Sequence, residues 1–127
     1  MIFVPAYAGV FGLLFIILSA RTIIARRSAK VAIGTGRNKQ LERAVRVHAN
    51  FAEYVPLTLL LISFAEQRGS HHLIIHLLCA VFLLGRALHA WGVSQEHENF
   101  TYRVTGMMIT FATIAVSSAA IGYSYLN

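Results

Sequence analysis

The chain has 127 residues, of which 57% are hydrophobic and 13% are charged. Its mean hydropathy of +0.62 is well above that of a typical water-soluble domain, and its four apolar stretches leave room only for short connections. The composition therefore excludes a second, soluble domain and predicts one all-α membrane domain over residues 1–127, a bundle of four transmembrane helices. A single cysteine, Cys79, excludes an intramolecular disulfide.

The first apolar stretch, residues 2–20, carries no charge, and basic residues follow it instead of preceding it. Because a secretory signal has the opposite order, we expect a retained transmembrane helix. Asn38 is suited to begin the second helix as an N-cap, and Pro56 is expected to kink that helix. The four predicted helices cover residues 4–26, 38–66, 71–93 and 101–125.

The net charge of +6 is concentrated between the first two helices. By the positive-inside rule this connection lies in the cytoplasm, so both termini lie on the non-cytoplasmic side of what we expect to be a bacterial inner membrane. We expect the connection to contact membrane lipids and not nucleic acid. Its basic residues are Arg26, Arg27, Lys30, Arg37, Lys39 and Arg43.

Three strongly polar residues, Arg46, Asn50 and Glu53, occupy the second predicted helix. At about 100° per residue they fall within a sector of roughly 60° on one helix face. Each intramembrane charge costs about 2.5–3.5 kcal/mol on insertion scales. Such a cost favours a polar site between helices that is shared with a ligand or with partner residues.

In the third predicted helix Arg86 and His89 share a face, and Arg103 lies in the first turn of the fourth. The predicted topology brings these arginines toward the cytoplasmic half of the membrane. Two interpretations remain open: the cations converge on an anionic small ligand, or each arginine separately reaches lipid phosphates. The histidine pair His72 and His76 has no Glu or Cys nearby to complete a site, so no metal site is predicted.

The segment from Glu42 to Leu57 contains the pattern Arg-x-His-x-Asn-x-x-Glu-x-x-Pro. This specific pattern resembles the second helix of the MAPEG family, the membrane-associated proteins in eicosanoid and glutathione metabolism. Three further segments resemble the family less specifically, but they occur in the same order and at the same spacing as in the family. They are residues 24–31, residues 85–89, and Arg103 followed by Gly106. The resemblance covers nearly the whole chain.

The resemblance implies a homotrimer of four-helix protomers that binds glutathione between subunits. It implies a transferase or peroxidase that presents the glutathione thiolate to a lipophilic small molecule, with Arg103 as the catalytic residue that stabilises the thiolate. Glu53 would accept the glutathione ammonium group, and Arg46 would face its carboxylates. The full set of implied glutathione-binding residues is Arg26, Arg27, Arg46, Asn50, Glu53, Tyr54, Arg86 and His89.

The chain departs from the family pattern near the expected position of the sulfur. Val93, Met107 and His89 stand where branches of the family have tyrosine. Because hydroxyl contacts to the sulfur are then missing, the resemblance supports glutathione binding more strongly than efficient catalysis. The alternative is a non-enzymatic member of the family, a trimeric membrane scaffold or lipid-binding protein.

Overall fold

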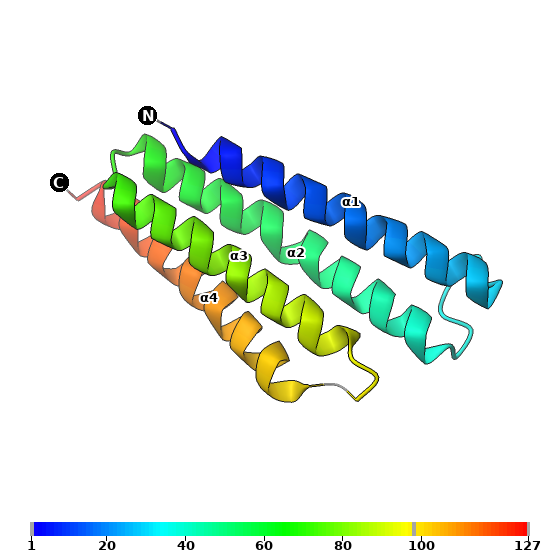
Figure 1. The fold of residues 1–127 in the computed structure, drawn as a ribbon. Helices are drawn as coiled ribbons and strands as arrows, with labels where there is room; N and C mark the ends of the chain where they lie inside the picture. The colour runs from blue at the N-terminus through cyan, green and yellow to red at the C-terminus, as the bar shows by residue number, and fades with distance from the viewer. Residues whose placement is uncertain (1, 98, 127) are drawn as a thin grey trace.

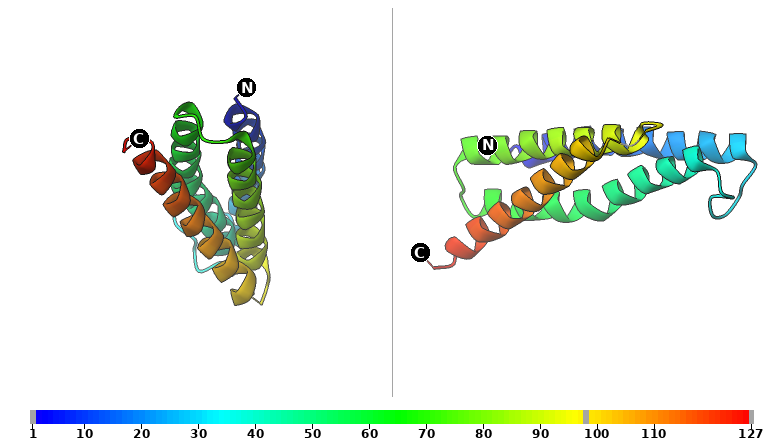
Figure 2. Two further views of the ribbon diagram at one scale, coloured as in Figure 1. Left: turned by 90° about the vertical axis from the view of Figure 1, so that its left-hand side faces the viewer. Right: turned by 90° about the horizontal axis from the view of Figure 1, so that it is seen from below.

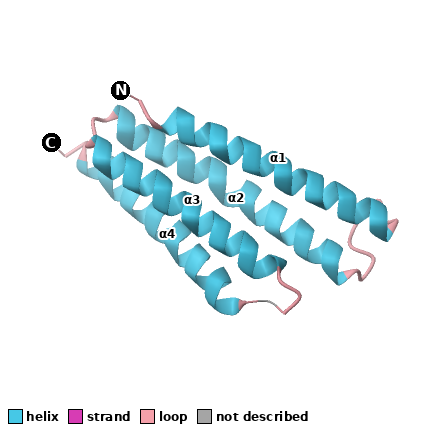
Figure 3. Cartoon of the chain, viewed as in Figure 1, coloured by secondary structure: helices cyan, strands magenta, loops and turns pink. Residues whose placement is uncertain are grey.

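The structure is a computed structural model that describes residues 2–97 and 99–126. Within these residues the chain forms four helices and no strand (Figures 1 and 3). The helices are α1 (Val4–Ala29), α2 (Lys39–Gln67), α3 (His72–Ser94) and α4 (Phe100–Tyr123). Each is long and apolar enough to cross a membrane. The predicted all-α fold is confirmed, although α1 continues past its predicted end at Arg26.

Side chains that accept hydrogen bonds explain where α2 and α4 begin. Asn38 Oδ1 accepts from the backbone N–H of Leu41 at 2.9 Å, which confirms the predicted N-cap of α2. Asn99 Oδ1 accepts from the backbone N–H of Tyr102 at 3.3 Å, so α4 begins at Phe100. Such caps satisfy N–H groups that have no partner inside the helix.

The first turn of α1 is capped by a side chain from another helix. Phe3, the N-cap residue of α1, makes no capping hydrogen bond with its own side chain. Instead the Glu66 carboxylate, at the end of α2, accepts from the backbone N–H groups of Phe3 and Val4. A carboxylate at this place also interacts favourably with the helix dipole. Glu66 therefore fixes the start of α1 to the end of α2.

Replacing Glu66 with alanine is expected to destabilise the bundle by about 1.5–3 kcal/mol, because hydrogen bonds to a charged group are lost and two N–H groups lose their acceptor. Thermal unfolding in detergent would show the effect as a lower Tm. Gln67→Ala is the matched control, since Gln67 is the exposed neighbour on the same helix. Equal Tm values for the two variants would contradict the capping role.

Helices that follow one another in the chain run in opposite directions. The α1–α2 and α3–α4 connections lie toward one end of the bundle, and the two termini lie at the other end with the α2–α3 turn (Figure 1). This arrangement agrees with the predicted number of crossings, while the side that faces the cytoplasm stays a prediction. The helix α2 continues through Pro56. Figure 2 shows that α2 bends near its middle and that α4 is inclined to the other helices.

Aromatic residues fill the space between the first three helices. The ring of Phe11 on α1 lies 5.1 Å from that of Phe82 on α3 and 6.1 Å from that of Phe51 on α2, measured between ring centres. All three side chains are buried. Aromatic pairs at these distances stabilise a core beyond the area that they bury.

The contact between α3 and α4 depends on glycine. A Cβ atom added to Gly106 would lie 2.5 Å from the carbonyl oxygen of Gly85 and 2.7 Å from the backbone nitrogen of His89. The buried residues of α4 are all small: Gly106, Thr110, Thr113 and Ser117. Small residues allow the backbones of membrane helices to approach closely. This close approach places the first turns of α4 against the end of α3, where the polar residues gather.

Candidate functional site: a cationic cavity between α2, α3 and α4

A cavity of about 380 Å³ lies at the end of the bundle that carries the α1–α2 connection. Its size falls within the range of small-molecule sites. Helix α2 contributes most of the wall, α3 contributes two residues, and α4 contributes one. The lining residues are Lys39, Glu42, Arg43, Arg46, Asn50, His89, Val93 and Arg103.

The charge of this lining is strongly positive. Four basic residues face one acidic residue, Glu42. Walls of low dielectric strengthen the field of charges that line a cleft, so the site attracts anions. Metal cations are disfavoured by the same charges, and among the described residues no group of three His, Cys, Asp or Glu side chains could hold a metal ion.

Arg86 lies behind the cavity wall and contacts it through Asn50. The Arg86 side chain is buried, and its Nη1 donates to Asn50 Oδ1 at 2.8 Å. Its Nη2 contacts Met107 Sδ at 3.7 Å, and its guanidinium carbon lies 5.9 Å from the centre of the Tyr54 ring. Because Arg86 occupies the carbonyl oxygen of Asn50, the amide group of Asn50 is left as a donor toward the cavity.

His89 and Arg103 come together through the tight contact between α3 and α4. The His89 side chain is only 5% exposed, and its backbone packs directly against Gly106. Arg103 is half-buried one turn before Gly106. The glycine contact therefore sets the position of both side chains in the cavity wall. Val93 completes the wall on α3 and offers no hydroxyl group.

The structure brings together Arg46, Asn50, His89 and Arg103 of the predicted set, but the other five members do not line the cavity. One of these is Arg86, which lies behind the wall. Glu53 is exposed on the surface of α2. Tyr54 packs edge-on against Phe111, with 5.7 Å between ring centres. Arg26 donates to the carbonyl oxygens of Ala32 and Gly34, at 3.4 and 2.8 Å. Arg27 is exposed near the end of α1.

Three cavity residues were not predicted to belong to the site, namely Lys39, Glu42 and Arg43. They extend the polar face of α2 by two turns before Arg46. The spacing from residue 39 through 42, 43, 46 and 50 follows the helical period, so the pattern that identified Arg46 and Asn50 also contains them. These residues were not assigned to the site because the basic residues of this segment were attributed to membrane topology and to contact with lipids.

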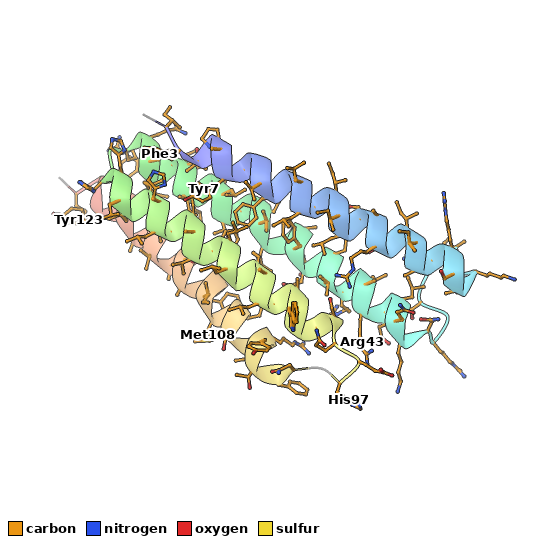
Figure 4. All side chains as sticks on the ribbon, in the orientation of Figure 1. Phe3, Tyr7, Arg43, His97, Met108 and Tyr123 are labelled. Atoms are coloured by element: carbon orange, nitrogen blue, oxygen red, sulfur yellow. The ribbon has the colours of Figure 1, made fainter. Side chains whose placement is uncertain are left out.

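The two histidines weighed as a metal pair lie at the opposite end of the bundle and pack on aromatic rings. His76 lies 3.9 Å from Phe3 between ring centres, and its Nδ1 is 3.3 Å from the hydroxyl of Tyr7. Figure 4 labels Phe3 and Tyr7 far from Arg43 and His97, which lie near the cavity end. The His76 contacts are structural and separate from the cationic site.

Four apolar helices, with a cluster of cationic side chains around a cavity at one end, define an integral membrane protein of the four-helix type. The model of the MAPEG family matches residues 4–123, nearly the whole chain. The chain therefore belongs to the MAPEG family, as its second-helix pattern predicted.

Two curated relatives carry the same description, "Inner membrane protein YecN". One comes from Escherichia coli strain K12 and the other from Escherichia coli O6:H1 strain CFT073. Each is 32% identical to this chain over 108 residues, which cover 85% of this chain and 81% of the relative. The similarity thus extends over most of both proteins.

Proposed function

We propose that this protein is a glutathione-dependent transferase or peroxidase-like enzyme of the bacterial inner membrane. It binds glutathione between the subunits of a homotrimer and presents the thiolate to lipophilic electrophiles from the bilayer. The observation that carries the proposal is the cavity of about 380 Å³ in which Arg46, Asn50 and Arg103 meet. Membership of the MAPEG family and the inner-membrane description of the relatives support it.

The cavity offers donors that suit an anionic peptide. Arg46 is suited to pair with a carboxylate of glutathione, because guanidinium groups bind carboxylates through paired hydrogen bonds. Asn50, whose oxygen is held by Arg86, supplies an N–H donor. The remaining basic residues of the lining balance the second carboxylate. With the other donors assigned to the carboxylates, Arg103 on the α4 side of the cavity is the cation that contacts the glutathione sulfur.

A thiol has an ordinary pKa of about 8.5, and only its thiolate form is a strong nucleophile. A cation beside the sulfur stabilises the thiolate, so the guanidinium of Arg103 raises the reactive fraction near neutral pH. In the transferase reaction the sulfur forms a bond to the electrophilic carbon, and the leaving group departs with the electron pair of the broken bond. His89 lines the same wall, and in the proposed site it contacts the ligand near this point.

The exposure of Glu53 supports a site that is completed by a neighbouring subunit. A charged side chain at the centre of a membrane helix costs about 2.5–3.5 kcal/mol when no partner accompanies it. Glu53 lies exposed on the surface of one protomer. In the proposed trimer a neighbouring subunit covers this face, and the glutathione ammonium group provides the opposite charge. Arg26 and Arg27 would then act from the adjacent subunit.

Binding of glutathione to the detergent-purified protein, measured by calorimetry, tests this arrangement. Glu53→Gln is expected to weaken binding by at least about ten-fold, because the ammonium group loses its charged partner. Glu42→Gln is the contrasting variant, since Glu42 is the acid among the cations of the cavity. Its removal should leave affinity unchanged or increase it. Equal weakening by both substitutions would contradict the role of Glu53.

One observation favours a second candidate function, a non-enzymatic membrane scaffold. The hydrogen bond between Arg86 and Asn50 links α3 to α2 without a ligand, so part of the polar face serves to hold helices together. A scaffold of this kind would show no response to glutathione in calorimetry, and a phospholipid that stays bound through purification would support it.

A further inference from the structure

A second groove lies beside the cationic cavity, between α1, α2 and the end of α3. It has a volume of about 260 Å³, and its polar lining consists of Arg21, Ser28, Gln40, Arg43 and Ser94. A larger space of about 680 Å³ shares Gln40, Arg43 and Ser94 with it as lining residues. Among the described residues that line the smaller groove, none is acidic.

Both arginines of the groove are held in place by neutral acceptors. Arg21 Nη2 donates to Ser94 Oγ at 3.3 Å, and Arg43 Nη2 donates to the carbonyl oxygen of Glu96. A guanidinium group has five N–H donors, so each arginine keeps donors for a further ligand. Two cations with hydroxyl and amide groups between them form a set that suits a phosphate group.

An aliphatic stripe on α1 leads from this polar end toward the middle of the membrane. Leu13 and Ile17 precede Arg21 by eight and four residues, so the three share one side of the helix. The side chains of Leu13 and Ile17 are exposed, and Ile24, in the groove itself, is exposed as well. This side of α1 therefore carries a positive charge at the helix end and exposed aliphatic side chains at membrane depth.

We propose that this groove binds an anionic phospholipid, with the phosphate between Arg21 and Arg43 and an acyl chain along Leu13 and Ile17. The combination of charge and apolar surface matches the two parts of a phospholipid. The proposal does not depend on glutathione binding.

Native mass spectrometry tests the proposal on the full chain in detergent. The protein would be incubated with dioleoylphosphatidylglycerol or with dioleoylphosphatidylcholine, which has the same acyl chains but no net charge. We expect retention of the phosphatidylglycerol adduct in clear excess over phosphatidylcholine. Arg21→Gln and Arg43→Gln should each reduce that adduct about five-fold, the electrostatic contribution of one basic residue near an anionic lipid. Inorganic phosphate should not displace the lipid, because the acyl chain holds it in the groove.

Arg37→Gln is the matched control, because Arg37 is an exposed arginine in the same basic connection and does not line the groove. It should keep the adduct within two-fold of the unsubstituted protein. Equal retention of the two lipids would overturn the proposal, as would equal losses in all three variants, which would indicate a general effect of charge. Displacement by inorganic phosphate would show a site for free phosphate instead. A change of oligomeric mass in the Arg21 variant, with the lipid adduct intact, would show that a second copy covers this face.

Discussion

Arg103→Ala is expected to lower glutathione-transferase turnover by about 10²–10³-fold while most glutathione binding remains. Removing one donor that stabilises a developing or established negative charge costs about this much in other enzymes. Binding should remain because, in the proposed site, the carboxylate and ammonium groups of glutathione contact residues of α2. Steady-state rates with a model electrophile, combined with calorimetry on the same preparation, separate the two effects.

Two further variants sharpen this result. Arg103→Lys keeps a positive charge and should recover part of the turnover, whereas a role in folding alone would not depend on that charge. Arg68→Ala is the matched control at the opposite end of the bundle, where Arg68 contacts Ser124 and lies over the ring of Tyr125. Unchanged turnover in Arg103→Ala would refute the assigned role of this residue.

Gly106→Ala is expected to disrupt the site from a position outside the cavity lining. The added Cβ would lie 2.5 Å from a backbone oxygen of Gly85 and 2.7 Å from the backbone of His89, and neither group can rotate away. Helices α3 and α4 must therefore separate. Overpacking of this kind costs about 1–3 kcal/mol. A displacement of about 1 Å at a reacting centre can lower the rate about 100-fold, so both Tm and turnover should fall.

Gly122→Ala provides the matched control on the same helix. A Cβ atom at Gly122 meets no atom within 4 Å, so this variant should keep the Tm and the turnover of the unsubstituted protein. If Gly106→Ala also kept both, the contact between α3 and α4 would not determine the position of His89 and Arg103. The comparison therefore tests the link between helix packing and the site without changing any charged residue.

The four helices were predictable because long apolar stretches and capping residues are local signals. Asn38 identified the start of α2 correctly, since its side chain caps a backbone N–H only three residues ahead. The cap of α1 was not predictable in this way. Glu66 is 63 residues from Phe3 in the sequence, and only the packing of α2 against α1 brings the carboxylate to the first turn.

The same distinction applies to the candidate site. Arg46 and Asn50 were expected on one helix face, and both line the cavity because one helix fixes their relative positions. Arg86 was expected to contact the ligand, but in the structure of the single chain it contacts Asn50 from behind the cavity wall. The rotation of α3 about its axis decides between these two positions, and the glycine contacts with α4 set that rotation. No spacing within α3 alone contains this information.

The proposed chemistry requires that glutathione bind in the site as its thiolate. An ultraviolet difference spectrum of the detergent-purified protein, recorded near neutral pH as glutathione is added, measures thiolate formation directly. We expect a thiolate signal that saturates with glutathione in the unsubstituted protein and is lost in Arg103→Ala. Absence of a saturable signal in the unsubstituted protein would show that Arg103 does not stabilise a bound thiolate, and it would favour a non-enzymatic membrane scaffold.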